Sequence, residues 1–244
     1  MIHAWGTTDR GAVRVQNQDS YYLALRTDDL VIAIVCDGMG GASAGNVASA
    51  LAVEYSKAYL EQLSVEELLE RPGDHMSEAA ERSNDVIFHR ANHDPNCRGM
   101  GTTMVAAVVH SEKAYILNIG DSRAYHINQS GIKKVTRDHS VVEALVQRGE
   151  ITPEEARTHP QKNLITRAMG SEHQCRSDLY EEKLERGDYL LLCSDGLSNM
   201  VTDQEMLFEV IHGGDASGCC QRLLDIAMSR GAPDNVTVIL IQIL

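Results

Sequence analysis

Short apolar runs rich in Val, Ile, Leu and Tyr recur along the chain, and turn-forming residues separate them. Such runs predict strands, and those without polar alternation predict strands buried on both faces. The runs cover residues 21–25, 30–36, 103–109, 114–119, 189–193 and 236–243. Two connections, residues 110–113 and 120–123, are so short that we expect the strands on either side of each to be antiparallel neighbours.

Helices are predicted between these strands. Apolar side chains recur at helical spacing from residue 44 to residue 59, and two further candidate helices cover residues 77–91 and 217–230. Capping boxes predict other helix starts at Ser64 with Glu67, Thr152 with Glu155, and Thr202 with Glu205. We therefore expect one α+β domain over residues 1–244, in which helices flank packed sheets.

The composition is typical of a globular protein and argues against some classes of binding partner. Of the 244 residues, 43% are hydrophobic and 23% are charged. The formal net charge of −13 argues against nucleic acid and anionic membranes, because both need clustered Lys and Arg. No apolar stretch approaches the roughly 20 residues of a membrane span and no signal peptide opens the chain, so we expect a cytoplasmic protein. The six cysteines lack CxxC spacing, which indicates neither a zinc ribbon nor a disulfide framework.

Five aspartates stand next to the predicted strands. Asp37, Asp121 and Asp195 follow apolar runs, whereas Asp19 and Asp234 precede them. Each alone is typical of a turn. Five together indicate carboxylates gathered at the rim of a buried sheet, which only bound cations make tolerable. Since no paired Cys or His accompanies them, all-oxygen ligation favours Mg²⁺ or Mn²⁺ over zinc.

Nine short motifs in order carry a resemblance to a known family. They are residues 8–14 (TDRGAVR), 17–20 (NQDS), 37–41 (DGMGG), 101–103 (GTT), 120–123 (GDSR), 138–140 (DHS), 165–170 (ITRAMG), 194–197 (SDGL) and 234–237 (DNVT). Over nearly the whole chain the sequence resembles the PP2C (PPM) family of metal-dependent protein serine/threonine phosphatases, in its compact bacterial form. The resemblance implies a β-sandwich of two mostly antiparallel sheets flanked by helix pairs.

The resemblance also implies two metal ions, Mn²⁺ or Mg²⁺, at one end of the sheets. Asp37 would bridge both ions, and the Gly38 carbonyl would bind one of them. Asp195 and Asp234 would bind the other. Asp19 would hold metal-bound water.

A third, weaker ion and the substrate phosphate have implied ligands as well. Asp121 would help to bind the third ion, and Arg14 would grip the phosphate, for which a guanidinium is well shaped. A hydroxide bridging the metals would attack phosphorus directly, without a covalent phosphoenzyme. The implied partners are phosphorylated proteins and a cognate serine/threonine kinase.

Two residues depart from the family pattern and leave an alternative open. Met39 stands where many eukaryotic members carry the His that protonates the leaving group, and Gln18 replaces a common Glu. These departures are compatible with a catalytically weak regulatory or phosphoprotein-binding protein, although the inner carboxylates argue for an enzyme. A metal-dependent nuclease also needs clustered carboxylates, but the net charge disfavours it.

Residues 138–170 correspond to the mobile flap of bacterial members. They include two predicted short helices, residues 141–149 and 153–158, and either a flap or a plain surface hairpin fits them. His139 within this segment is interpreted as a structural hydrogen bonder rather than a proton shuttle. His89 and His93 lie four residues apart, but without a third ligand nearby they predict a solvated helix face.

Overall fold

Two antiparallel sheets form the centre of the protein. The computed structural model describes residues 1–40 and 44–244, so Gly41, the last residue of the DGMGG motif, lies outside the described part. The first sheet has the order β1 (Ile2–Asp9), β11 (Val236–Ile243), β10 (Tyr189–Cys193), β7 (Arg123–Asn128) and β8 (Gly131–Lys134). The second has the order β2 (Asp19–Thr27), β3 (Leu30–Met39), β5 (Met104–His110), β6 (Lys113–Ile119) and β9 (Asp178–Lys183), with β4 (Gly101–Thr102) on the end of β3.

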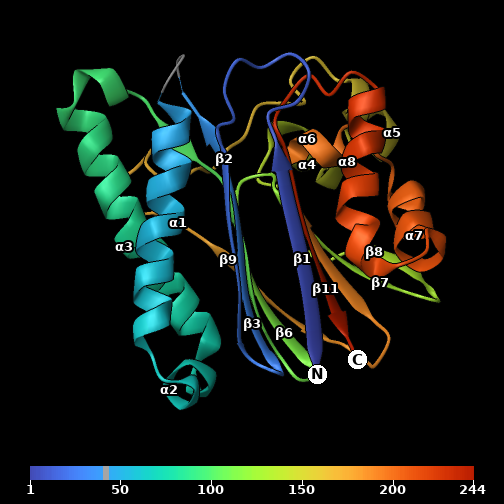
Figure 1. Ribbon diagram of the computed structural model, residues 1–244. Coiled ribbons are helices and arrows are strands. Elements are labelled where there is room, and N and C mark those ends of the chain that lie inside the picture. Colours follow the sequence, from blue (N-terminus) through green and yellow to red (C-terminus); the bar gives the residue numbers. More distant parts are fainter. Residues whose placement is uncertain (41–43) are drawn as a thin grey trace.

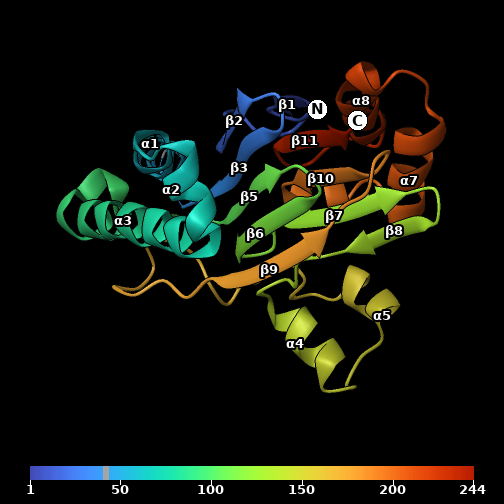
Figure 2. The same ribbon diagram turned by 90° about the horizontal axis from the view of Figure 1, so that it is seen from below.

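Helices cover the outer face of each sheet, which gives four layers (Figure 1). The second sheet is covered by α1 (Gly45–Gln62), α2 (Val65–Glu70) and α3 (Pro72–His93). The first sheet is covered by α6 (Asp195–Ser198), α7 (Asp203–His212) and α8 (Cys219–Ser229). Figure 2 shows α4 (Val141–Gln147) and α5 (Pro153–Thr158) together at one side of the sandwich. Two 3₁₀ turns, Pro95–Cys97 and Ala216–Gly218, complete the helical elements of the described residues.

Three apolar clusters hold these layers together. Every second residue from Leu30 to Cys36 in β3 packs against α1 and α3, and the residues between them pack against the other sheet. A third cluster lies between the first sheet and the pair α7 and α8. Because burial of apolar surface contributes about 25 cal/mol per Å², these clusters stabilise the stacking of the four layers. In the described part of the chain, no helix has both the length and the hydrophobicity needed to cross a bilayer.

The predicted strands and helices are confirmed, with one error in pairing. Ala114–Ile119 lies within β6 and pairs with β5 across residues 110–113, as expected. The connection 120–123 was expected to join paired strands, but β6 and β7 belong to different sheets. Gly120 has φ +103°, a conformation that favours glycine, and the chain crosses there from one sheet to the other. Asp121 therefore lies between the two sheets.

Several strands carry too little apolar pattern to be predicted. Within the described residues, the outer strands β1, β8 and β9 each pair with one neighbour, and β7 has polar side chains at both of its ends. The sequence of β9, DLYEEK, alternates between intermediate and exposed positions. Tertiary pairing rather than local hydrophobicity makes these segments strands. Helix α3 is also longer than the predicted 77–91, because Pro72 suits the first turn of a helix.

Candidate active site

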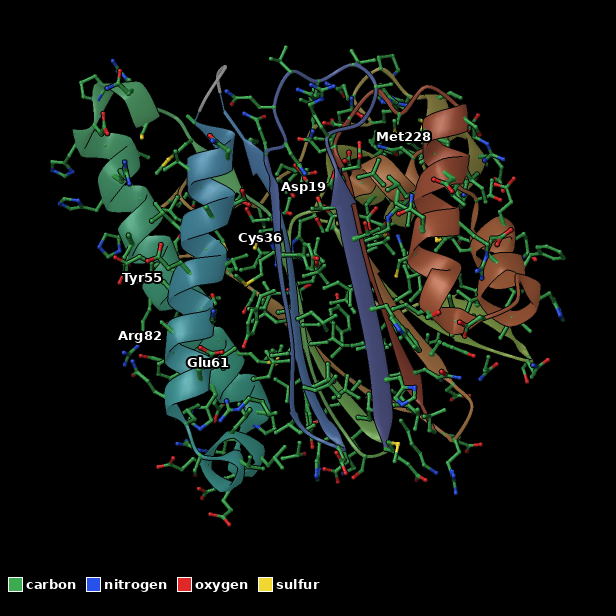
Figure 3. The ribbon with its side chains drawn as sticks, viewed as in Figure 1. Asp19, Cys36, Tyr55, Glu61, Arg82 and Met228 are labelled. Atoms are coloured by element: carbon green, nitrogen blue, oxygen red, sulfur yellow. The ribbon has the colours of Figure 1, made fainter. Side chains whose placement is uncertain are left out.

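Two of the five aspartates are direct neighbours in the second sheet. Asp19 opens β2 and pairs in register with Asp37 of β3, so the two side chains leave the sheet on the same face. Val31 and Val35 of β3 face the first sheet, and the two-residue repeat of a strand directs Asp37 to that side as well. Figure 3 shows Asp19 between the two sheets, towards the end of the sandwich at which β2 begins.

Asp19 is held by hydroxyl groups from the opposite sheet. Ser194 Oγ and Thr237 Oγ1 donate to its Oδ2 atom at 2.7 and 2.6 Å. Its Oδ1 atom is buried and has no hydrogen-bond partner among the described residues. Burial raises the pKa of Asp19 to about 7 against the effect of both hydroxyls, and the charges of Asp195 and Asp234 raise it further. The motifs contain Ser194 and Thr237, but nothing in the sequence reveals that they bridge the sheets through Asp19.

Asp37 is positioned by its backbone. Its N–H donates to Thr103 Oγ1 at 3.0 Å, and its carbonyl accepts from the Thr103 N–H and the Thr102 hydroxyl, both at 2.9 Å. Burial raises the pKa of Asp37 well above the usual range, and the charges of the other four aspartates act in the same direction. All five carboxylates are therefore close enough to interact.

Gly38 follows Asp37 where three backbone segments meet. Its N–H donates to the Gln18 carbonyl at 3.1 Å. A Cβ atom at this position would lie 2.1 Å from the Gly45 carbonyl oxygen, so only glycine fits. The close approach places the start of α1 directly against the end of β3.

Asp195 and Asp234 come from the first sheet. Asp195 begins α6 just after β10; its Oδ2 accepts from Asn199 Nδ2 at 3.0 Å, and its buried Oδ1 is unpaired within residues 1–40 and 44–244. Burial, followed by the charge of Asp234, raises the pKa of Asp195. Asp234 precedes β11 and accepts from Arg14 Nη2 at 2.7 Å. Its Oδ1 accepts the Asn235 N–H at 2.9 Å.

The loop that carries Arg14 is fastened by one residue that the sequence analysis did not single out. Asn235 is buried, and its Nδ2 donates to the carbonyls of Arg10 at 2.8 Å and Gln16 at 3.0 Å. Its Oδ1 accepts the Gln18 N–H at 2.8 Å. This side chain therefore clamps both ends of the loop between β1 and β2 while the Arg14 guanidinium stays half exposed.

Asp121 is supported from the flap side. His139 Nδ1 accepts the Gly120 N–H at 3.0 Å, so the ring carries its proton on Nε2, which donates to Asp178 at 3.1 Å. Asn118 Nδ2 donates to the Gly120 carbonyl at 3.2 Å. Burial raises the pKa of Asp121 to about 8, and the charge of Asp195 adds to this effect. The contacts agree with the structural role expected for His139.

The donor atoms of this rim suit a hard divalent cation. As the side chains stand, no three His, Cys, Asp or Glu residues of the described chain converge on one metal position. The carboxylate of Asp234 is turned to Arg14, and one oxygen of Asp195 is turned to Asn199. However, the buried and unpaired oxygens of Asp19 and Asp195 carry a desolvation penalty that a cation would remove.

The remaining candidate residues lie as follows. Met39 pairs in register with Gly101 and lines a surface groove. Its thioether has no proton to donate. His89 and His93 stack at 4.1 Å between ring centroids on the outer side of α3. Cys36 and Cys193 are fully buried, and burial raises the pKa of both thiols, that of Cys193 to about 12.

The segment 138–170 begins at a buried ion pair. Nε and Nη2 of Arg123 donate hydrogen bonds to the Asp138 carboxylate at 2.6 to 3.1 Å. Helices α4 and α5 follow along the segment. Between these helices and the rim lies a cavity of about 420 Å³, with Asp121 and Asp195 on one wall and Val142 on another. The predicted helix pair of this segment is confirmed, and it borders the acidic rim.

Comparison with known proteins identifies this architecture. The model of the family described as Protein phosphatase 2C matches residues 10–214. The chain is 37% identical over 242 residues to the serine/threonine phosphatase stp of Listeria welshimeri, over 99% of this chain and 96% of that protein. The crystal structure of the serine/threonine phosphatase Stp1 from Staphylococcus aureus has a TM-score of 0.94 at 38% identity, over 100% of this chain and 96% of that chain.

A further solved structure contains metal. The catalytic domain of the serine/threonine protein phosphatase PstP, in complex with two manganese ions, has a TM-score of 0.85 at 33% identity, over 99% of this chain and 97% of that chain. These similarities extend over the whole sandwich. The chain belongs to the protein phosphatase 2C family, a family of metal-dependent phosphatases, which confirms the resemblance carried by the nine motifs.

Proposed function

We propose that the acidic rim is the active site of this protein serine/threonine phosphatase and that it holds two divalent ions, Mn²⁺ or Mg²⁺. Asp37 would contact both ions, with the Gly38 carbonyl on one of them. Asp195 and Asp234 would hold the other, and Asp19 would hold metal-bound water. The observation that carries the proposal is the pair of buried, unpaired oxygens of Asp19 and Asp195 in the described structure.

The reaction that we propose is hydrolysis of phosphoserine and phosphothreonine in proteins. When bound, the two cations lower the pKa of water and withdraw charge from the phosphate oxygens. Arg14 presents its guanidinium beside Asp234 at 2.7 Å and would orient the phosphate through two parallel hydrogen bonds. Met39 has no proton to give, so the leaving alkoxide takes its proton from another source.

Three finer features belong to the same proposal. Asp121 would help to hold a third ion, because it borders the cavity beneath α4 and α5 together with Asp195. Residues 138–170 would act as a flap over that cavity within a domain spanning residues 1–244. The enzyme would work in the cytoplasm against a serine/threonine kinase, and its six free thiols are typical of a reducing compartment.

The decisive experiment compares metal dependence with loss of one ligand. Hydrolysis of p-nitrophenyl phosphate and of a phosphothreonine peptide is measured with Mn²⁺, with EDTA, and for Asp195→Asn. Activity should vanish in EDTA and fall by at least about a hundredfold in Asp195→Asn. Asp85→Asn, on the exposed side of α3, is the matched control and should behave like the wild type. Full activity in EDTA or in Asp195→Asn would exclude the metal mechanism.

A further inference from the structure

A groove of about 610 Å³ opens next to the acidic rim. Its lining includes Met39, the end of α3 around Phe88 and Ala91, and the turn from Asp94 to Gly101. Ala168, Gly170 and Ser171 complete the lining. Figure 1 shows the end of α3 at the same end of the sandwich as the end of β3 and the loop between β1 and β2.

The walls of the groove are firmly fixed. Thr102 and Met169 exchange two backbone hydrogen bonds at 3.1 and 2.9 Å, which join β4 to the last residues of the segment 138–170 and fix that end of it. The buried Asn84 of α3 accepts the Gly170 N–H at 2.7 Å and donates to the carbonyls of Glu172 and His173, each at 3.1 Å. The groove is therefore a preformed feature of the fold.

The lining suits an extended polypeptide. Three glycines and two alanines line the groove, and the half-buried side chains of Met39 and Phe88 supply its apolar surface. Flexible methionine side chains adapt to varied apolar partners. Small lining residues leave room for the backbone of a strand-like segment.

The groove is continuous with the site of phosphate hydrolysis. Met39 follows Asp37 by two residues on the same strand, a spacing of about 6.6 Å. An extended substrate advances about 3.3 Å per residue, so a side chain some two residues from the phosphorylated position reaches Met39. The groove therefore begins within reach of a substrate chain whose phosphate lies at Asp37.

One cation lies along this path. Arg98 is exposed and is the only Lys or Arg in the described lining of the groove. Within the described chain no carboxylate lies within ion-pair distance of it, whereas the neighbouring Asp94 already caps the Asn96 N–H and lies 3.8 Å from Arg90. Arg98 stands three residues before Gly101, and Gly101 is the register partner of Met39. The Cα atoms of Arg98 and Gly101 are therefore at most about 11 Å apart.

We infer that this groove binds the substrate polypeptide beside the phosphorylated residue, with an apolar side chain against Met39 and a carboxylate at Arg98. The inference rests on the proposed phosphatase function and adds a substrate class to it. The preferred substrates are phosphoproteins with an acidic residue about three to five positions from the phosphorylated residue.

The test uses pairs of phosphothreonine peptides that differ only in Glu or Lys, placed three to five positions before or after the phosphothreonine. The ratio of kcat/KM for the Glu and Lys peptides is measured with Mn²⁺ for wild type and Arg98→Glu. This ratio does not depend on the fraction of active enzyme. We expect the wild type to favour Glu on one side, and Arg98→Glu to shift that ratio by about tenfold towards Lys, through KM.

Two further variants sharpen the result. Arg186→Glu reverses an exposed charge just before β10, at the opposite end of the strand from Asp195, and should leave the ratio unchanged. Ser171→Trp, which fills the groove, should reduce the Glu preference. If Arg98→Glu and Arg186→Glu keep the wild-type ratio, the inference is wrong although the phosphatase function stands. If the wild type hydrolyses neither p-nitrophenyl phosphate nor any peptide, the proposed function itself fails.

Discussion

Asp19 of β2 and Asp37 of β3 are register partners whose carboxylates share the face between the two sheets. Like charges placed directly opposite each other destabilise an antiparallel pair. Ser194 and Thr237 satisfy one oxygen of Asp19, and the other stays unpaired within the described structure. Folding thus brings carboxylates together, and the repulsion between their charges lowers the stability of the folded protein until bound cations compensate it.

Removal of the Asp19 charge should raise the stability of the metal-free protein and lower the activity of the enzyme. Asp19→Asn keeps the shape of the side chain and, at pH 8.5, where Asp19 is ionised, removes a buried charge, so the metal-free protein should gain about 1–2 kcal/mol, or roughly 2–8 °C in Tm. Activity with Mn²⁺ should fall at least about tenfold, because a carboxylate supporting the metal site is lost. Thermal unfolding in EDTA and p-nitrophenyl phosphate hydrolysis measure the two effects. A lower Tm in EDTA together with full activity would contradict the role assigned to Asp19.

The metal-free protein should become less stable as the pH rises. Burial raises the pKa of Asp19 to about 7 and of Asp121 to about 8, above their values in the unfolded chain. Such groups contribute stability that is fully present below about pH 4 and is lost as the pH rises through 7 to 8. In EDTA, Tm should therefore be lower at pH 8.5 than at pH 5.5.

The double variant Asp19→Asn/Asp121→Asn provides the control for this pH dependence. It lacks both titrating groups, so its Tm in EDTA should change less between the two pH values than that of the wild type. Saturating Mn²⁺ should also weaken or reverse the slope, because cations bind the ionised carboxylates. Equal slopes for wild type and double variant in EDTA would assign the pH dependence to other groups.

Asn235 should act as a positioning residue for Arg14. Asn235→Ala removes three hydrogen bonds from a buried side chain to the loop that carries Arg14, which should cost about 2–3 kcal/mol. KM for a phosphopeptide should rise more than kcat falls, because the guanidinium loses its fixed position. Urea unfolding and steady-state kinetics test both effects. An unchanged KM in a destabilised variant would limit Asn235 to a structural role.

His126 should stabilise the sandwich without a part in catalysis. Its Nδ1 lies 2.9 Å from Glu182 of β9 in the second sheet, and its Nε2 lies 2.7 Å from Asp188, which precedes β10 of the first sheet, so the ring connects carboxylates of both sheets. His126→Leu leaves these largely buried carboxylates without the ring and should cost about 2–3 kcal/mol in urea unfolding. Activity with Mn²⁺ at 25 °C should persist, since His126 pairs near the start of β10 and Asp195 follows its end.

The exposed His3 of β1 supplies the comparison for this variant. His3→Leu should change the free energy of unfolding by less than about 0.5 kcal/mol. A similar loss in both variants would show that the effect of His126→Leu does not come from its two carboxylate partners.

Much of the fold could be predicted from local patterns. The continuous apolar run in β3 and the helical spacing of α1 identify buried elements, because each burial pattern repeats within a few residues. The capping boxes at Ser64, Thr152 and Thr202 each begin a helix as expected. Outer strands such as β9 escaped prediction, since their conformation depends on a neighbour that local sequence does not specify.

For the site, the sequence by itself determined which aspartates stand at strand ends and, through the ordered motifs, the family. Only the tertiary structure decided which residues form hydrogen bonds to the site and position its side chains. Asp19 takes its two hydroxyl partners from positions 175 and 218 residues away, and Asn235 fastens the loop of Arg14 from more than 200 residues away. The tertiary structure also placed Asp121 between the two sheets, whereas the short connection 120–123 had predicted that the strands on either side of it pair with each other. Such contacts depend on how two sheets pack face to face, and no local pattern in the chain encodes that packing.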